Sequence, residues 1–308
     1  EFPDPAPGAG EVLVRIEAVT TCPHWDMHLM NDEPMFPGAP FTYPYPVGQP
    51  GHEAVGIVEE TGVGVSGFDP GTRVVAWRDP GQERSGSYAE LNTFNADDLL
   101  VVRENDNVSS PESIAPLELA MCVQVTFDRL LQSDLVRHKR IAVSGLGPAG
   151  LVAIQMAKAY GASEVVGIEP LSSRREVASD LGIADAFAPT DRQVTHIKRR
   201  TDEAFDVSID CTGLKKSIEF LMDRTTQAVS IFGVLREEVI FGPGHWVDLS
   251  LIGYGTHSRS AAEQALDLVL SGAVKLAPLV SATLPLGKYC EGIEMLEKKE
   301  AIKICFKP

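Results

Sequence analysis

The stretch Val143-Ser-Gly-Leu-Gly-Pro-Ala-Gly150 decides how the middle of this chain folds. It follows a short apolar run and opens an amphipathic segment, residues 149–160. The glycines at Gly145, Gly147 and Gly150 permit a tight turn, close approach of a pyrophosphate, and packing of the helix on the strand. The helix N-terminus then offers unpaired N–H groups to phosphates. This pattern predicts a strand–turn–helix unit that binds a dinucleotide.

A carboxylate stands where such a site needs one. Glu169 ends the next apolar run and follows Gly150 by nineteen residues. A carboxylate there accepts hydrogen bonds from the adenosine ribose and repels a 2′-phosphate, so we expect NAD rather than NADP. Arg174 and Arg175 follow; they are either solvated residues of a first helical turn or charges near the cofactor. The cofactor-binding residues expected here are Gly145, Gly147, Pro148, Ala149, Gly150, Glu169 and Arg174.

Strand-like and helical segments alternate from residue 141 to residue 254. We expect strands at 141–144, 164–168, 207–210, 227–232 and 249–254, and helices at 149–160 and 173–181. This alternation predicts an α/β fold with a doubly wound parallel sheet, a Rossmann domain. Ligands bind at the carboxyl ends of such strands. The turns after two of these strands therefore place Cys211, Thr212, Gly233 and Val234 beside the cofactor.

The first third of the chain is β-like and rich in turns. Residues 11–18, 55–60 and 73–77 alternate or cluster as strands do, whereas the proline-rich residues 31–50 form a loop. The aromatic residues of this loop either line a substrate pocket or pack within the loop. Helices are expected at 117–131 and 261–270.

The composition of the chain limits the classes of protein to which it can belong. A chain of 308 residues favours two domains, and 44% hydrophobic with 23% charged residues is typical of a soluble globular protein. No apolar stretch is long enough to span a membrane. A net charge of −16 argues against binding to nucleic acid, which requires a basic face. The chain begins at Glu1 with neither an initiator Met nor a signal-like segment, so we expect that its true start is missing.

The five cysteines are odd in number and widely spaced, as in a reducing cytoplasm, where thiols are metal ligands or core residues. Cys22 and Cys122 together with His52 form a three-ligand zinc set whose fourth position stays open, which suits a catalytic zinc. Taken singly, each of these thiols is better explained as a buried free cysteine, whereas the set with His52 favours zinc.

His52 stands in a longer frame, Gly51-His-Glu53-x-x-Gly56-x5-Gly62-x-x-Val65. With this frame the chain resembles the zinc-dependent medium-chain alcohol and polyol dehydrogenases over essentially its whole length. The resemblance implies a GroES-like, β-rich catalytic domain at residues 1–123 and 257–308, and an NAD-binding Rossmann domain at residues 124–256. It also implies a homo-oligomer, a dimer or tetramer, formed through an exposed edge of the nucleotide-domain sheet.

The resemblance implies the metal ligands. Cys22, His52 and Cys122 match the three ligands of the catalytic zinc. Cys122 lies 23 residues before Gly145, close to the spacing in the family. Glu118 is a rival ligand whose spacing to the same glycine fits less well.

The resemblance also implies catalytic roles. Glu53 matches a carboxylate behind the zinc that helps ligand exchange, and Thr126 matches a residue that packs at the nicotinamide. His24 is either the start of a proton relay or a loop residue that faces water. We expect a zinc-bound alkoxide to pass its hydride to NAD.

Two departures from the family stand out. Trp25 occupies the position of a carboxylate that orients the ligand His, and Asp26 takes over this role only after a local shift. Losing such a partner lowers metal affinity by about 10- to 100-fold. Between Trp77 and Ala115 there is no cysteine, so the lobe that holds a structural zinc in many relatives is replaced by a short link, residues 78–86.

Three functions remain open. We expect an NAD-dependent zinc enzyme, cytoplasmic, that acts on a small secondary alcohol, a polyol or a related carbonyl. The first alternative is a zinc-free NAD(P)H quinone or enone reductase, against which the Cys-His-Cys set and Glu169 argue. The second is a protein that binds NADH without catalysis, which likeness of fold does not exclude.

Overall fold

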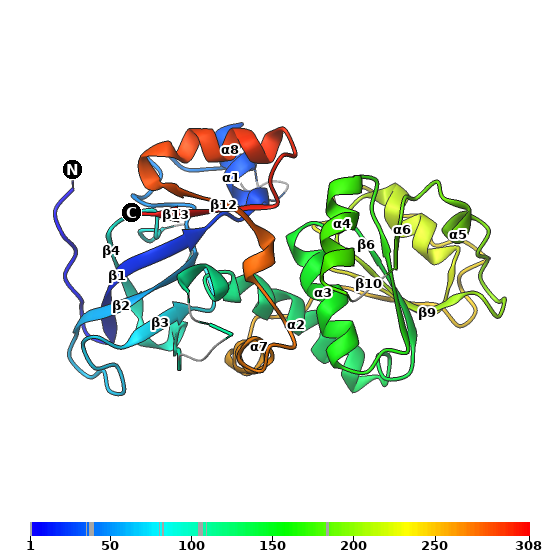
Figure 1. Cartoon of the computed structure of the whole chain (residues 1–308), viewed down its shortest axis with the longest axis horizontal. Coiled ribbons are helices and arrows are strands. Elements are labelled where there is room, and N and C mark those ends of the chain that lie inside the picture. Colours follow the sequence, from blue (N-terminus) through cyan, green and yellow to red (C-terminus); the bar gives the residue numbers. More distant parts are fainter. Residues whose placement is uncertain are drawn as a thin grey trace. The chain divides into compact units, whose positions relative to one another are not determined.

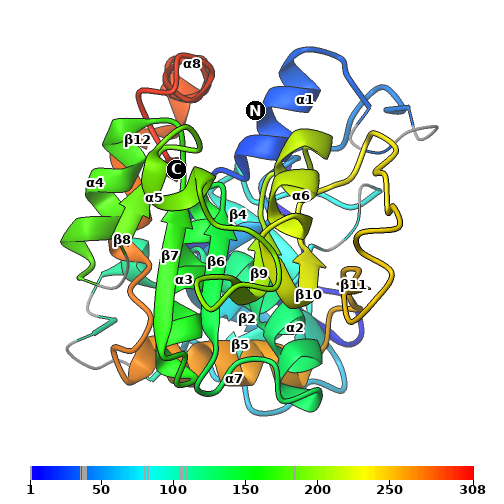
Figure 2. The ribbon, with the colours of Figure 1, turned by 90° about the vertical axis from the view of Figure 1, so that its right-hand side faces the viewer.

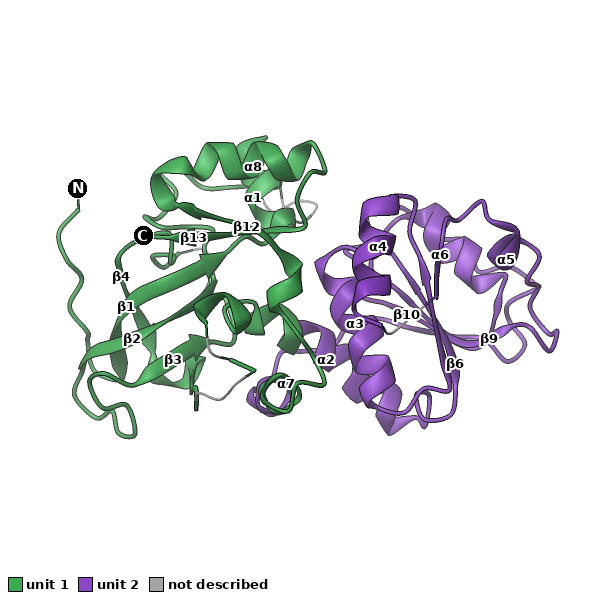
Figure 3. Ribbon diagram, in the orientation of Figure 1, with its two compact units in different colours: residues 1–121, 265–308 green, residues 122–264 purple. Residues whose placement is uncertain are grey.

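The computed structural model describes residues 2–34, 36, 40–79, 81, 83–103, 107–108, 110–182 and 185–308. The chain forms two compact units, residues 1–121 with 265–308 and residues 122–264 (Figure 3). The boundaries fall inside two helices, α2 (Leu117–Gln132) and α7 (Arg259–Leu270). Within the described residues, no helix has the length and apolar character that crossing a membrane requires.

The second unit is built on a six-stranded sheet in the order β11-β10-β9-β6-β7-β8, with every pairing parallel. Figure 2 shows its middle strands side by side. The strands are β6 (Arg140–Ser144), β7 (Glu164–Ile168), β8 (Asp185–Phe187), β9 (Phe205–Asp210), β10 (Thr225–Ile231) and β11 (Ser250–Ile252). The helices between them are α3 (Pro148–Ala159), α4 (Ser172–Asp180), α5 (Arg192–Thr195) and α6 (Lys215–Met222).

This strand order confirms the predicted Rossmann sheet. The chain leaves β6 to build β7 and β8 on one side, then returns to place β9 on the other side. The order therefore reverses between β6 and β9, where doubly wound sheets bind their ligands. The middle strand β6 is buried on both faces, which explains its continuous apolar run, whereas β9 also buries the polar side chains of Ser208 and Asp210.

The first unit is built on a seven-stranded sheet in the order β12-β13-β1-β2-β3-β5, with β4 also paired to β1 (Figure 1). Its strands are β1 (Glu11–Thr20), β2 (Glu53–Thr61), β3 (Arg73–Ala76), β4 (Leu91–Asn95), β5 (Leu99–Val101), β12 (Val280–Pro285) and β13 (Lys303–Lys307). The remaining elements of this unit are α1 (Pro23–Met30), α8 (Tyr289–Glu297), and 3-10 turns η1 (Ala96–Asp98), η2 (Pro111–Ser113), η3 (Ala277–Leu279) and η4 (Leu286–Lys288).

The long strand β1 organises this sheet. Its first half pairs with β4, its last residues pair with β13, and β2 runs along its whole length. The glycines that frame His52 make this pairing possible. A Cβ atom on Gly56 would lie 2.2 Å from the carbonyl oxygen of Arg15, and one on Gly62 would lie 1.7 Å from that of Gly8. Side chains at these two positions would force the strands apart.

Candidate metal and cofactor sites

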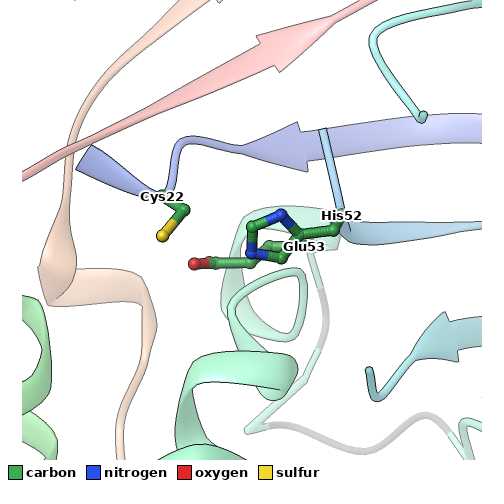
Figure 4. Close-up of side chains that lie close together, drawn as sticks. All are labelled: Cys22, His52 and Glu53. Atoms are coloured by element: carbon green, nitrogen blue, oxygen red, sulfur yellow. The ribbon is translucent and has the colours of Figure 1, made fainter. Parts of the chain in front are cut away.

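The metal ligands predicted near the N-terminus meet in the first unit. Cys22 immediately precedes α1, and His52 immediately precedes β2. Thr20 pairs with Glu53 across the antiparallel strands β1 and β2, and this register brings the segment that follows β1 close to the segment that precedes β2. One ligand atom each of Cys22, His52 and Glu53 lies within 4.8 Å of the others (Figure 4).

Glu118 completes a donor set around the imidazole. Its Oε2 lies 3.7 Å from Nε2 of His52, and both side chains are buried. This distance is too long for a hydrogen bond. It fits two ligands of one tetrahedral zinc, which are about 3.4 Å apart when each bond is about 2.1 Å. The donor types, one thiol, one imidazole and one carboxylate, are those that zinc prefers.

The environment of His52 is that expected of an imidazole that binds a metal ion. Its Nδ1 donates a hydrogen bond of 2.8 Å to the carbonyl oxygen of Pro50, which orients the ring and leaves Nε2 for the site. Burial lowers the pKa of His52, but the hydrogen bond with Cys22 and the charge of Glu118 outweigh it, so the pKa lies well above its usual value. Negative groups thus converge on this nitrogen, as they would on a cation.

Asp26 does not orient the ligand His, because the Pro50 carbonyl does. The Asp26 carboxylate accepts hydrogen bonds from the hydroxyls of Tyr88, at 2.9 Å, and Tyr289, at 2.7 Å. Its second oxygen is buried and has no partner within the described residues. Burial raises the pKa of Asp26 to about 6, although both tyrosines oppose the shift. Asp26 is therefore held by two tyrosines, and the expected role of orienting the ligand imidazole belongs to the Pro50 carbonyl.

Glu53 is fixed by an ion pair that the sequence analysis did not predict. Lys303 Nζ, from β13, lies 2.6 Å from both carboxylate oxygens of Glu53, and both side chains are buried. The Thr20 hydroxyl donates a further hydrogen bond of 2.7 Å to Glu53, and Lys303 also donates to the carbonyl of Thr21. With its oxygens occupied in this way, Glu53 lies beside the ligands as a supporting carboxylate. The available signal was Lys303 itself, a lysine between the apolar residues Ile302 and Ile304.

Trp25 and His24 lie on α1, directly after Cys22. The Trp25 ring packs against Phe36 and Phe41 with centroid distances of 6.2 and 6.3 Å, so part of the proline-rich loop rests on it. Residues 35 and 37–39 of that loop lie outside the described residues. The ring of His24 lies 4.6 Å from that of His28, one turn later, whose Nδ1 lies 3.5 Å from Glu33.

Helix α2 carries three predicted site residues on one face. Glu118, Cys122 and Thr126 are spaced four residues apart, so they follow one another along the helix. Cys122 belongs to the second unit, where its Sγ lies 3.5 Å from Nε2 of His257, a neighbour that the sequence analysis did not predict. Its place as a zinc ligand stays a prediction. Thr126 is buried, and its hydroxyl has no partner within the described residues.

The dinucleotide turn has the backbone that the glycines predicted. Gly145 has a φ of +83°, and a Cβ atom on it would lie 2.5 Å from the side chain of Thr212. A Cβ atom on Gly150 would lie 1.8 Å from the carbonyl oxygen of Gly145. Gly147 caps α3, whose first residues are Pro148 and Ala149. No side-chain hydrogen bond caps this helix end, so the backbone N–H groups of Ala149 and Gly150 can bind a phosphate.

Glu169 lies at the end of β7, as expected, and is buried. It accepts backbone hydrogen bonds from Leu146, at 2.8 Å, and Leu171, at 3.0 Å. Nη1 of Arg174 lies 3.9 Å from the Glu169 carboxylate. Arg175 is held by the chain itself, because its Nη1 donates to the carbonyl oxygens of Glu169 and Pro170.

The turns after β9 and β10 contact each other closely. A Cβ atom on Gly213 would lie 2.2 Å from the carbonyl oxygen of Val234, and one on Gly233 would lie 2.0 Å from the nitrogen of Gly213. The buried Asp210 holds the first turn, accepting hydrogen bonds from Gly213 and from the Thr212 hydroxyl, each at 2.7 Å. Burial and this carboxylate raise the pKa of the neighbouring Cys211 well above its usual value, so this thiol stays protonated.

Comparison with known proteins identifies two dehydrogenase family models that match this chain. Residues 8–104 match the family described as alcohol dehydrogenase GroES-like domain, and residues 148–271 match the family described as zinc-binding dehydrogenase. The chain belongs to the zinc-type medium-chain dehydrogenase family. It is therefore an oxidoreductase of the alcohol dehydrogenase type, and the predicted combination of a GroES-like with a Rossmann domain is confirmed.

The relatives of this dehydrogenase are named for different activities. It is 29% identical to the acryloyl-coenzyme A reductase of Metallosphaera sedula, over 98% of this chain and 93% of that protein. It is 24% identical to the sorbitol dehydrogenase of Halalkalibacterium halodurans, over 100% of this chain and 94% of that protein. The crystal structure of 2R,3R-butanediol dehydrogenase from Bacillus subtilis matches its fold with a TM-score of 0.81 at 23% identity, covering 100% of this chain and 95% of that one.

Proposed function

We propose that this dehydrogenase transfers a hydride between NAD and a secondary alcohol or polyol, with one catalytic zinc per chain. The observation that carries the proposal is the convergence of Cys22, Glu53 and Glu118 on the imidazole of His52. In this reading the first unit is the catalytic domain and the second unit, residues 122–264, is the NAD-binding domain.

Cys22 and His52 hold the zinc, and α2 supplies the third ligand. The family resemblance favours Cys122, whereas the distance of 3.7 Å to His52 favours Glu118. When bound, zinc acts as a Lewis acid that lowers the pKa of an alcohol hydroxyl and polarises a carbonyl. The ion pair with Lys303 holds Glu53 behind the ligands.

His24 takes the substrate proton in this proposal. It lies two residues after Cys22, and its ring contacts that of His28. His28 in turn lies 3.5 Å from Glu33, whose side chain is exposed. This series of groups leads from the neighbourhood of the metal ligands to solvent, as the release of a proton requires.

The dinucleotide lies on the turn of residues 145–150, with its pyrophosphate at the N-terminus of α3. Glu169 accepts hydrogen bonds from the adenosine ribose in addition to its two backbone donors. The Thr126 hydroxyl is buried without a partner among the described residues, which suits contact with a bound nicotinamide. The turns at Cys211 and Gly233 border the cofactor at the same sheet edge.

The first experiment measures zinc per chain by elemental analysis of protein purified without chelators. About one zinc per chain, with oxidation of secondary alcohols or polyols by NAD, supports the proposal. A protein that holds no zinc after reconstitution contradicts it.

A second candidate is an enone reductase, because one relative matched over 98% of this chain is an acryloyl-coenzyme A reductase. Such an enzyme delivers hydride to a carbon–carbon double bond beside a carbonyl. Reduction of α,β-unsaturated carbonyls by the zinc-free protein, without turnover of alcohols, would favour this candidate over the first.

We also propose that the dehydrogenase is a homo-oligomer. Among the described strands, the edge strand β11 pairs with β10 alone. Leu251 on this strand and Trp246 just before it are exposed, at 39% and 73%. Light scattering of the wild type and of Leu251→Lys tests this: the variant should be a monomer, and a monomeric wild type would contradict the proposal.

A further inference from the structure

We propose that Tyr88 is a positioning residue that sets the separation of the two zinc ligands Cys22 and His52. The inference rests on the proposed function, because it requires that these two side chains hold the metal. All the residues concerned belong to the first unit.

Strand pairing positions His52 more firmly than Cys22. The pairing of β1 with β2 ends at Thr20 and Glu53, and His52 directly precedes β2. Cys22 lies two residues beyond β1, and its side chain makes no capping hydrogen bond to α1. Among the residues of α1, all of which the structure describes, Asp26 alone is buried. The place of α1, and of the thiol before it, therefore depends largely on what holds Asp26.

The hydroxyl of Tyr88 holds Asp26. It donates a hydrogen bond of 2.9 Å to Oδ1 of Asp26, whose backbone N–H in turn donates to the carbonyl oxygen of Cys22, at 3.0 Å. Burial and the charge of Asp26 raise the pKa of Tyr88 well above its usual value, so the hydroxyl keeps its proton and remains a donor. One hydrogen bond and one helical turn thus connect Tyr88 with the first ligand.

The backbone and ring of Tyr88 contact the residue before the second ligand. A Cβ atom on Gly51 would lie 2.8 Å from the backbone nitrogen of Tyr88 and 3.0 Å from Cγ of its ring. The N–H of Ser87 donates to the carbonyl oxygen of Gly51 at 2.7 Å, and the N–H of Tyr88 donates to that of Gly48 at 3.0 Å. A glycine at position 51 therefore lets Tyr88 pack directly against the segment that ends at His52.

Two other aromatic rings fix the ring of Tyr88. Its centroid lies 5.0 Å from that of Tyr289 and 5.7 Å from that of Phe306, and the latter two are 5.5 Å apart. Phe306, on β13, is fully buried. Close-packed side chains transmit a displacement rather than absorb it. The fixed ring therefore imposes a defined distance between Gly51 at one end and Asp26 at the other.

Tyr289 allows positioning of the ligands to be separated from stabilisation of the fold. Its hydroxyl donates a hydrogen bond of 2.7 Å to the same oxygen of Asp26, but it comes from α8, whereas the candidate zinc ligands lie on other elements. If the cluster only stabilised the fold, loss of either hydroxyl would have the same effect on metal binding. If Tyr88 sets the separation of the ligands, loss of its hydroxyl has the larger effect.

The test measures the zinc affinity of the full-length protein by competition with a chromophoric chelator. The proteins are the wild type, Tyr88→Phe and, as the matched control, Tyr289→Phe. Each variant keeps its aromatic ring and loses one hydroxyl. Cobalt(II) absorption is a second readout, because the thiolate-to-cobalt and d–d bands depend on the arrangement of the ligands. Thermal unfolding in EDTA checks that each metal-free protein is folded.

We expect Tyr88→Phe to raise the dissociation constant of zinc by about ten-fold or more, and Tyr289→Phe to change it by less than about three-fold. The cobalt bands of Tyr88→Phe should shift or weaken, because its ligands are less well placed. Those of Tyr289→Phe should match the wild type.

Three outcomes would overturn the inference and leave the proposed function intact. They are a zinc affinity of folded Tyr88→Phe within about three-fold of the wild type, equal weakening by the two variants, and cobalt bands of Tyr88→Phe identical to those of the wild type. A folded wild type that binds no zinc contradicts the proposed function itself, and the inference with it.

Discussion

Replacing Lys303 by Met should destabilise the first unit more than the substitution of any exposed residue does. The lysine and Glu53 are both buried, and their charged atoms lie 2.6 Å apart. Without Lys303 the carboxylate would stay buried and lose its ionic partner, retaining the Thr20 hydroxyl as a donor. Breaking a buried pair in this way costs about 3–5 kcal/mol. With an m-value of about 2 kcal/mol per molar urea, the urea concentration at the midpoint of unfolding should fall by about 2 M.

Urea unfolding followed by tryptophan fluorescence measures this loss. A Trp246→Phe background leaves Trp25 and Trp77, both in the first unit, as reporters of that unit. EDTA in all samples removes the contribution of a bound metal to stability. Lys298→Met is the matched control, because the ion pair of Lys298 with Glu294 is exposed and should contribute less than about 1 kcal/mol.

The double variant Glu53→Gln with Lys303→Met separates the lost charge pair from lost packing. It removes the unpaired charge, so it should recover most of the stability that Lys303→Met loses. The reasoning is refuted if the free energy of unfolding of Lys303→Met lies within about 1 kcal/mol of that of the Trp246→Phe background. It is also refuted if the double variant is as unstable as the single one.

Three further predictions concern the metal site and its surroundings. Glu118→Gln and Cys122→Ser, assayed for zinc per chain and for NADH binding, identify the third ligand. The variant that removes it should lose zinc and turnover but keep NADH binding, and loss of zinc by neither would exclude α2 as the source of a ligand. Because burial raises the folded-state pKa of Asp26 from 3.8 to about 6, stability should fall by about 2 kcal/mol as the pH rises from 4 to 6. Asp26→Asn should abolish that fall in urea titrations, and an unchanged pH dependence would show that another group causes it. His24→Ala should lower kcat most strongly near neutral pH, and a pH–rate profile parallel to that of the wild type would dismiss the relay.

The sequence alone was sufficient for the fold and for the dinucleotide turn. Alternation of apolar runs with amphipathic segments depends on local periodicity, and the expected strands at residues 141–144 and 164–168 agree with β6 and β7 within one residue. Local rules also explain much of the turn, because the positive φ of Gly145 and the close approach of Gly150 to the Gly145 carbonyl depend on neighbouring residues. The strands β4 and β8 were not predicted, because neither is an apolar run: their sequences are Leu-Asn-Thr-Phe-Asn and Asp-Ala-Phe.

Only the tertiary structure decided what surrounds the predicted ligands. Lys303 reaches Glu53 across 250 residues of sequence, and Glu118 reaches His52 from a different element. The Pro50 carbonyl, rather than Asp26, orients the ligand imidazole. These partners depend on the register of β1 with β2 and β13 and on the place of α2, which no local pattern encodes. Side chains distant in sequence meet only after the sheets have formed, because burial and strand pairing, not periodicity, set the distances between them.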